Sequence, residues 1–196
     1  ARALPLAESA ELITESYAAA APTDRRLLRR RLGAERRTDF VDALMRLDLD
    51  DRERARLLAF ASEAVAAAYL PDLADLVPSV RALATRHPEV VLRHLRERAT
   101  GALPLVRAHW WTWAAPGVGS LVAHDPAGVL DLLEADRPAG AVAKGVIDHL
   151  GALMRYDGHR VAVLLTHANN ALPHRLPSVL RRNAHLLSPH DRVRVA

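Results

Sequence analysis

A short phrase recurs along this chain, and its period constrains the fold more than any single residue does. The copies are HPEVVL at 87–92, DPAGVL at 125–130, DGHRVA at 157–162 and PHDRVR at 189–194. Their aligned valines are Val91, Val129, Val161 and Val193, which are spaced by 38, 32 and 32 residues. Self-similarity at such a period, inside helical sequence, predicts helix pairs that stack into a solenoid.

The composition favours helices over strands. Hydrophobic residues make up 50% of the 196 residues but aromatic residues only 4%, so the apolar mass is chiefly alanine and leucine. Both residues favour helix, and no run of alternating apolar and polar residues predicts a strand. The absence of cysteine excludes disulfides, thiolate metal sites and cysteine nucleophiles, and is compatible with a reducing cytosol. We therefore expect an all-α fold, an α-solenoid of antiparallel helix pairs.

Prolines, glycines and short polar residues divide the sequence into at least nine helices. We expect them over 6–20, 24–33, 38–47, 51–70, 71–86, 103–115, 139–155, 160–168 and 176–187, with two more beginning at Pro88 and Pro126. Residues 116–123 are expected to be an irregular insertion. Without a low-complexity linker, residues 1–196 are expected to form one domain, with regular repeats over 50–196 and the least regular ones over 1–49.

The chain does not begin with Met, and its last residues follow the start of the fourth copy. We therefore expect a segment of a longer chain, in which Val193 and Val195 form an apolar surface that the following repeat covers.

Helix pairs with a proline near the start of the first helix and a period in the thirties resemble HEAT and armadillo-type repeats. This resemblance implies a superhelix whose second helices line a concave binding surface, here the helices at 71–86, 102–115, 139–155 and 174–187. Their candidate partner-binding residues are Arg107, Trp111, Lys144, Asp148, Arg155, Ser178, Arg181, Arg182 and His185. The alternative interpretation is that these are ordinary solvated helix faces.

All three tryptophans lie together at 110, 111 and 113. Trp110 and Trp113 are three residues apart and share the apolar side of their helix, which predicts core positions. Trp111 points about 100° away from Trp110 on a helix. We therefore expect Trp111 to be less buried than Trp110, as a candidate for stacking on a base or a peptide.

The positive charge is concentrated near the N-terminus. Residues 24–37 carry a net charge of +5, the whole chain carries +4, and the remainder therefore carries −1. This basic patch consists of Arg25, Arg26, Arg29, Arg30, Arg31, Arg36 and Arg37. Phosphates or an acidic protein are the candidate ligands, and a solvated helix face is the plain alternative.

No motif indicates catalysis, and none indicates a metal or a cofactor. The ten histidines form neither HExxH nor HxH, and Gly117-Val118-Gly119 lacks the preceding strand of a dinucleotide site. Asn183 interrupts an apolar stripe, and a buried asparagine bonded to a neighbouring loop is the expected explanation.

The sequence thus predicts a cytoplasmic interaction scaffold that binds a protein or peptide, without catalytic activity, cofactor or membrane contact. The alternative is a nucleic-acid-binding HEAT-like module. DNA glycosylases built on HEAT-like repeats hold tryptophans, arginines and an aspartate in a basic groove, and Trp111, Arg107 and Asp148 are loose counterparts here. A purely structural spacer is the third interpretation.

Overall fold

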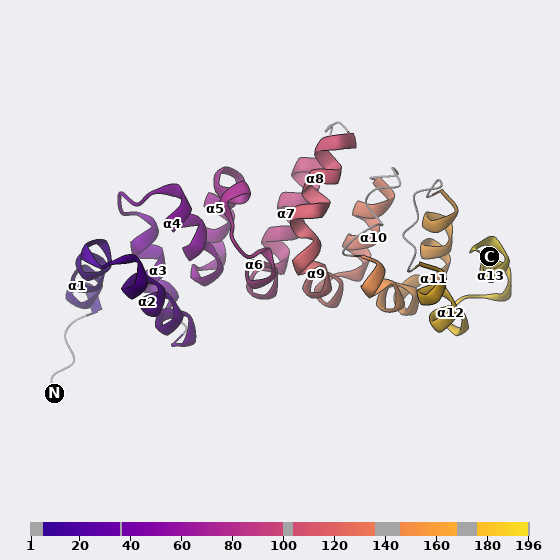
Figure 1. Cartoon of the computed structure of the whole chain (residues 1–196), viewed down its shortest axis with the longest axis horizontal. Coiled ribbons are helices and arrows are strands. Elements are labelled where there is room, and N and C mark those ends of the chain that lie inside the picture. The colour runs from indigo at the N-terminus through magenta and orange to yellow at the C-terminus, as the bar shows by residue number, and fades with distance from the viewer. Residues whose placement is uncertain (1–5, 36, 100–103, 136–145, 168–175, 196) are drawn as a thin grey trace. The chain divides into compact units, whose positions relative to one another are not determined.

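The computed structural model describes residues 6–35, 37–99, 104–135, 146–167 and 176–195. These residues form thirteen α-helices and five short 3-10 helices, and no strand occurs among them (Figure 1). The all-α prediction is confirmed. The chain divides into two compact units, Ala1–Ser79 (unit 1) and Val80–Ala196 (unit 2).

Unit 1 holds five α-helices, and α3 supplies much of its core. They are α1 (Leu6–Ala19), α2 (Pro22–Ala34), α3 (Thr38–Met45), α4 (Asp51–Leu57) and α5 (Glu63–Leu73), with 3-10 turns at Leu58–Phe60 and Ala74–Leu76. The buried side chains of α3 are Phe40, Val41, Leu44 and Met45. Residues 40, 41, 44 and 45 lie on one side of the helix, and this side of α3 packs on α1, α2 and α4.

Unit 2 holds eight α-helices. They are α6 (Val80–Arg86), α7 (Pro88–Ala99), α8 (Pro104–Ala114), α9 (Val118–His124), α10 (Pro126–Ala135), α11 (Leu150–His167), α12 (Leu176–Asn183) and α13 (Pro189–Val195). Further 3-10 turns span Ala115–Gly117, Ile147–His149 and Ala184–Leu186. Helix α11 is kinked at Asp157, whose backbone is not helical (φ −150°, ψ 91°).

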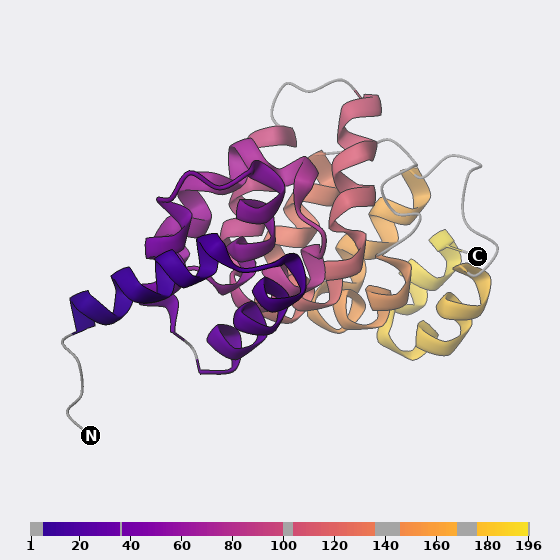
Figure 2. The same ribbon diagram turned by 60° about the vertical axis from the view of Figure 1, so that its left-hand side comes forward.

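The helices that carry the recurring phrase pack one on the next; α7, α10 and α13 start at it, and α11 carries it at its kink. α7 contacts α10, α10 contacts α11, and α11 contacts α13, and the two views show these helices side by side (Figures 1 and 2). The phrase is a helix start. In its second copy Asp125 Oδ1 accepts from the Gly128 N–H at 2.8 Å, and in its third Asp157 Oδ1 accepts from the Arg160 N–H at 2.9 Å.

The fourth copy of the phrase lies one residue earlier than the aligned valines indicate. Ser188 is the capping residue, because its Oγ accepts from the Asp191 N–H at 3.1 Å. Ser188-Pro189 therefore corresponds to Asp125-Pro126, and Val193 corresponds to Leu130. Val91, Val129 and Val161 are buried, as their alignment predicts, whereas Val193 is 80% exposed.

Several predicted boundaries are wrong for identifiable reasons. Residues 116–123 are not an irregular insertion, because Pro116 lies in a 3-10 turn that leads directly into α9. The long helix expected over 51–70 is interrupted at Ser62, whose Oγ caps α5 by accepting from the Val65 N–H at 3.4 Å. Pro71 lies inside α5 and does not end it. In that last turn, a proline removes only one helical hydrogen bond.

Gly117 allows a close approach between α6 and the start of α9. A Cβ at this position would lie 2.7 Å from Ala84 Cβ and 3.2 Å from the Val80 carbonyl oxygen. Gly117→Ala should therefore destabilise unit 2 by about 1–3 kcal/mol, the usual range for overpacking. At Gly119 a Cβ would meet only the imidazole of His149, a side chain that can rotate away. Gly119→Ala is the matched control in thermal unfolding, and equal melting temperatures for both variants would contradict the close approach.

Candidate functional site

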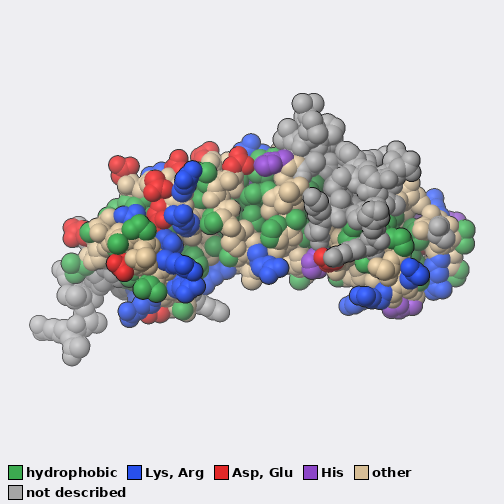
Figure 3. Space-filling model, viewed as in Figure 1, with side chains coloured by type: hydrophobic (Ala, Val, Ile, Leu, Met, Phe, Trp, Pro, Cys, Tyr) green, Lys and Arg blue, Asp and Glu red, His purple; other side chains and the backbone are tan. Residues whose placement is uncertain are grey.

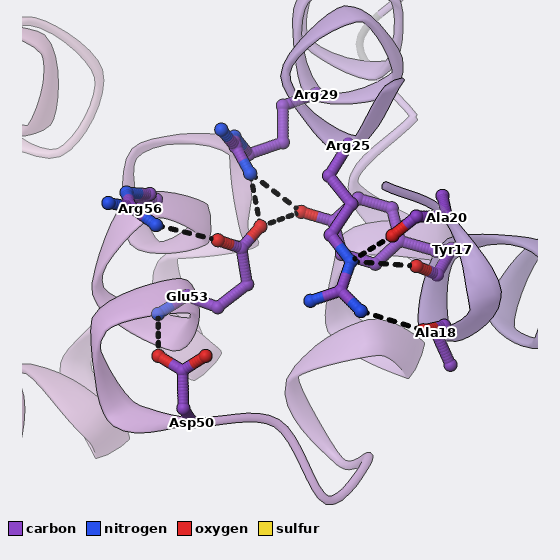
Figure 4. A network of polar contacts seen from close by, with 8 residues as sticks. All are labelled: Tyr17, Ala18, Ala20, Arg25, Arg29, Asp50, Glu53 and Arg56. Atoms are coloured by element: carbon purple, nitrogen blue, oxygen red, sulfur yellow. Dashed lines mark hydrogen bonds and ion pairs between the residues drawn. The ribbon is translucent and has the colours of Figure 1, made fainter. Parts of the chain in front are cut away.

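A buried polar network joins three helices of unit 1 (Figure 4). Tyr17 of α1 is fully buried and donates its hydroxyl hydrogen to the Glu53 carboxylate of α4. Arg29 of α2 donates to the same carboxylate oxygen and, at 3.0 Å, to the Tyr17 hydroxyl. Arg56 binds the other Glu53 oxygen at 3.0 Å. Glu53 is only 4% exposed, so this carboxylate is almost completely satisfied by its own chain.

The network fixes the charge states of its members. Burial acts to raise the pKa of Glu53, but hydrogen bonds from Tyr17 and Arg56 and the arginine charges outweigh it, and the pKa lies below its usual value. Burial and the bond to Glu53 raise the pKa of the Tyr17 phenol well above its ordinary range. The tyrosine therefore stays a neutral donor and the glutamate a charged acceptor, which is an arrangement that stabilises the fold.

Arg25 also binds its own chain. Its Nε donates to the carbonyls of Tyr17 (3.1 Å) and Ala20 (3.0 Å), and its Nη2 donates to that of Ala18 (2.6 Å). These carbonyls lie at the C-terminal end of α1, where backbone acceptors lack helical partners and a positive charge is favoured. Arg25 and Arg29 were predicted as members of a basic patch, and the structure engages both in intramolecular contacts.

The remaining arginines of the basic patch divide into paired and unpaired ones. Arg31 pairs with Glu35 at 2.8 Å and Arg37 with Asp39 at 3.2 Å, while Arg36 lies outside the described residues. Arg26 and Arg30 are exposed and form no ion pair within the part of the chain that the structure describes. The uniform basic patch is therefore reduced to two outward cations on α2. Figure 3 shows arginine side chains gathered in a row across the part of unit 1 that holds α2 and α4.

A second charged surface lies on α11 and α12. Arg155 of α11 is exposed, as is Asp148 in the preceding turn. Ser178, Arg181 and Arg182 of α12 are exposed too, as is His185 in the 3-10 turn that follows it. Helix α12 and the adjoining 3-10 turns pack on α11. A Cβ at Gly151 would lie 2.7 Å from Asn183 Oδ1, so the end of α12 lies against the start of α11. Lys144 lies outside the described residues.

Asn183 differs from its prediction. The side chain is half-buried against Gly151, and its Nδ2 donates to the Val179 carbonyl at 2.9 Å, four residues earlier in its own helix. It therefore bonds within α12 and not to a neighbouring loop.

The tryptophans are more alike than their spacing predicts. Trp110 is 8% exposed and Trp111 9%, so both are buried and the expected difference between them is absent. Their helix, α8, contacts both α6 and α7. Trp110 also packs edge-on against His94, with ring centroids 5.2 Å apart. Trp111 is therefore not a surface residue available for stacking, and the side chain of Arg107 lies outside the described part.

Two polar contacts in unit 2 were not predicted from the sequence. Arg160 binds Glu134 through two bonds of 2.7 Å and Asp131 at 2.6 Å, which ties α11 to α10. Asp191 of α13 accepts from the Ser188 hydroxyl at 2.6 Å and contacts His159 Nδ1 at 2.9 Å. These contacts hold the pKa of Asp191 below its usual value. Ser188 bonds the carboxylate and not the imidazole, so this group is a helix cap and not a nucleophile with its base.

Within the described ranges, no three His, Asp or Glu side chains come together as metal ligands. None of the helices in these ranges has the length and apolar character needed to cross a membrane. The chain matches no protein-family model, no curated protein and no solved structure.

Proposed function

We propose that this chain is a helical-repeat interaction module that binds another protein through exposed, charged helix faces and has no catalytic activity of its own. In this proposal the helix pairs form a HEAT-like solenoid, and the protein acts in the cytoplasm. The consecutive packing of α7, α10, α11 and α13, which all carry the recurring phrase, supports the repeat architecture.

The observation that carries the proposal is the division of the arginines. Inward ones such as Arg29 and Arg160 are bound to carboxylates of the chain itself. Outward ones such as Arg26, Arg30 and Arg182 are exposed and have no ion pair among the described residues. Cations that the fold does not use are available to an anionic partner, and arginine is enriched where protein interfaces bind most strongly.

The same division favours a protein over a nucleic acid. Affinity for duplex DNA depends on the number of phosphates that are neutralised, and specific binders contact many. Intramolecular contacts occupy Arg25, Arg29, Arg31 and Arg37, which leaves few cations for a phosphate backbone. The burial of Trp111 also removes the residue that the glycosylase resemblance would use to stack on a base.

Site-specific photo-crosslinking in cells that naturally express the protein tests this function. A photoreactive phenylalanine analogue at position 182 should give a discrete protein adduct, because this position lies on the exposed face of α12. The adduct should disappear when Arg181→Glu reverses a neighbouring charge, and it should persist after nuclease treatment. The analogue at Ala123, an exposed position on α9, is the control. An adduct that nuclease removes, equal adducts at both positions, or no adduct at 182 would contradict the proposal.

A further inference from the structure

Helix α2 carries two arginine doublets, Arg25-Arg26 and Arg29-Arg30. The first arginine of each doublet faces inward, and the second faces outward. Arg25 and Arg29 lie four residues apart on the side of α2 that faces α1 and α4, and both are bound there. Arg26 and Arg30 follow one residue later, which rotates them by about 100° to the outside. Both are exposed. The repeated doublet thus gives α2 one arginine pair that fixes the helix and another that faces solvent.

A large apolar side chain lies beside the outer arginines. Leu27 is 63% exposed, although Leu32 of the same helix is buried in the core. On a helix, Leu27 lies three residues before Arg30 and about 100° from Arg26, so the leucine and both arginines lie on the outer half of α2. A single exposed leucine is common on protein surfaces. Placed beside two exposed cations, it completes a mixed surface with one apolar contact and two charged ones.

Contacts on the inner side of α2 fix the position of this outer face. Arg25 fastens α2 to the end of α1, and Arg29 fastens it to Glu53 of α4. Binding to a helix whose position is already fixed requires little ordering, so more of the contact energy appears as affinity. Among the described residues, neither Arg26 nor Arg30 forms an ion pair with a neighbouring carboxylate. Asp24 lies in the first turn of α2, and Glu35 is paired with Arg31 at the opposite end.

We propose that the outer face of α2, formed by Arg26, Leu27 and Arg30, docks an acidic helix of a partner protein that presents one large apolar side chain between carboxylates. Charge complementarity defines this occupant, because guanidinium groups bind carboxylates through paired hydrogen bonds while the apolar side chain covers Leu27. The proposal rests on the proposed interaction function and adds the chemistry of the partner. A nucleic acid fits less well, because this face has two cations and no aromatic or glycine residue.

Fluorescence anisotropy with the full 196-residue chain tests the docking site. The probe is a labelled synthetic helix of about 18 residues, with leucine on one face and glutamates three and four residues on either side. It should bind, and binding should weaken as salt is raised. Arg26→Gln/Arg30→Gln should weaken binding at least about tenfold, and Leu27→Ala should weaken it by about tenfold, consistent with the loss of a buried leucine. These substitutions keep good helix formers.

Matched controls separate this site from general charge attraction. Arg93→Gln/Arg194→Gln removes two exposed cations from unit 2 and should leave the affinity unchanged. A probe with glutamine for glutamate should not bind. Equal weakening by both arginine double variants, full binding by Leu27→Ala, or displacement of the probe by an equal concentration of duplex DNA would overturn the proposal. Crosslinking through position 182 is independent of α2, so an adduct there alongside a failed peptide titration refutes the α2 site alone.

Discussion

Glu53→Ala should destabilise unit 1 by about 3–5 kcal/mol, because removing one partner of a buried ion pair leaves the other charge without compensation. Glu53 joins α4 to Tyr17 of α1 and Arg29 of α2, and its side chain is 5% exposed. The variant leaves the Arg29 guanidinium, 13% exposed, facing a cavity. Urea unfolding followed by circular dichroism measures the loss of stability.

Two further variants show which contact matters. Arg56, the outer partner of Glu53, has a side chain that is 48% exposed. Arg56→Gln should therefore change stability by less than about 1 kcal/mol. Tyr17→Phe removes only the buried hydroxyl and should cost about 1–3 kcal/mol, because it leaves the carboxylate short of one donor. A loss for Glu53→Ala no larger than that for Arg56→Gln would show that the network does not hold the three helices together.

The same carboxylate contributes to the pH dependence of stability. The pKa of Glu53 is lowered in the folded state, so the unfolded chain binds the proton more readily. The stabilisation is therefore fully present above the unfolded glutamate value of about 4.3, and it is lost as pH falls through the lower folded value. Glu53→Gln should make the free energy of unfolding depend less on pH between about pH 5 and the folded pKa. Urea titrations at successive pH values measure this dependence.

The sequence predicts those helix ends that local chemistry determines. The boundary between α1 and α2 follows from Pro22, and the start of α10 follows from Asp125-Pro126. The break at Ser62 was missed because apolar residues continue with helical spacing across it. In the structure the Ser62 N–H donates to Asp42, twenty residues earlier, at 2.8 Å. That bond depends on tertiary packing, which a local pattern does not contain.

The charged residues of the candidate surfaces show the same limit. Their positions on helix faces follow from periodicity, and residues 178, 181, 182 and 185 are exposed as predicted. The division of the basic patch does not follow from it, because Arg29 finds Glu53 twenty-four residues away. One signal was available: Arg25 and Arg29 share the helix face of the buried Leu32, whereas Arg26 and Arg30 do not. Helical spacing could therefore have separated inner from outer arginines before their partners were known.

Trp110→Ala and Trp111→Ala should each destabilise unit 2 by about 3–5 kcal/mol, the range for deleting a buried aromatic side chain. The sequence alone predicted a large loss for Trp110 and a small one for Trp111. The nearly equal burial of the two side chains now predicts similar losses. Urea unfolding of the two variants, compared with Thr112→Ala at an exposed position of the same helix, measures the difference.

Trp110→Phe distinguishes packing from polar contacts in this cluster. The Trp110 indole N–H is buried and has no hydrogen-bond acceptor among the described residues, so phenylalanine removes an unsatisfied donor along with some volume. Its loss should therefore be well below that of Trp110→Ala, since the ring can keep its edge-on contact with His94. A small loss for Trp111→Ala would instead show that Trp111 lies at the surface, where a tryptophan is available to a partner.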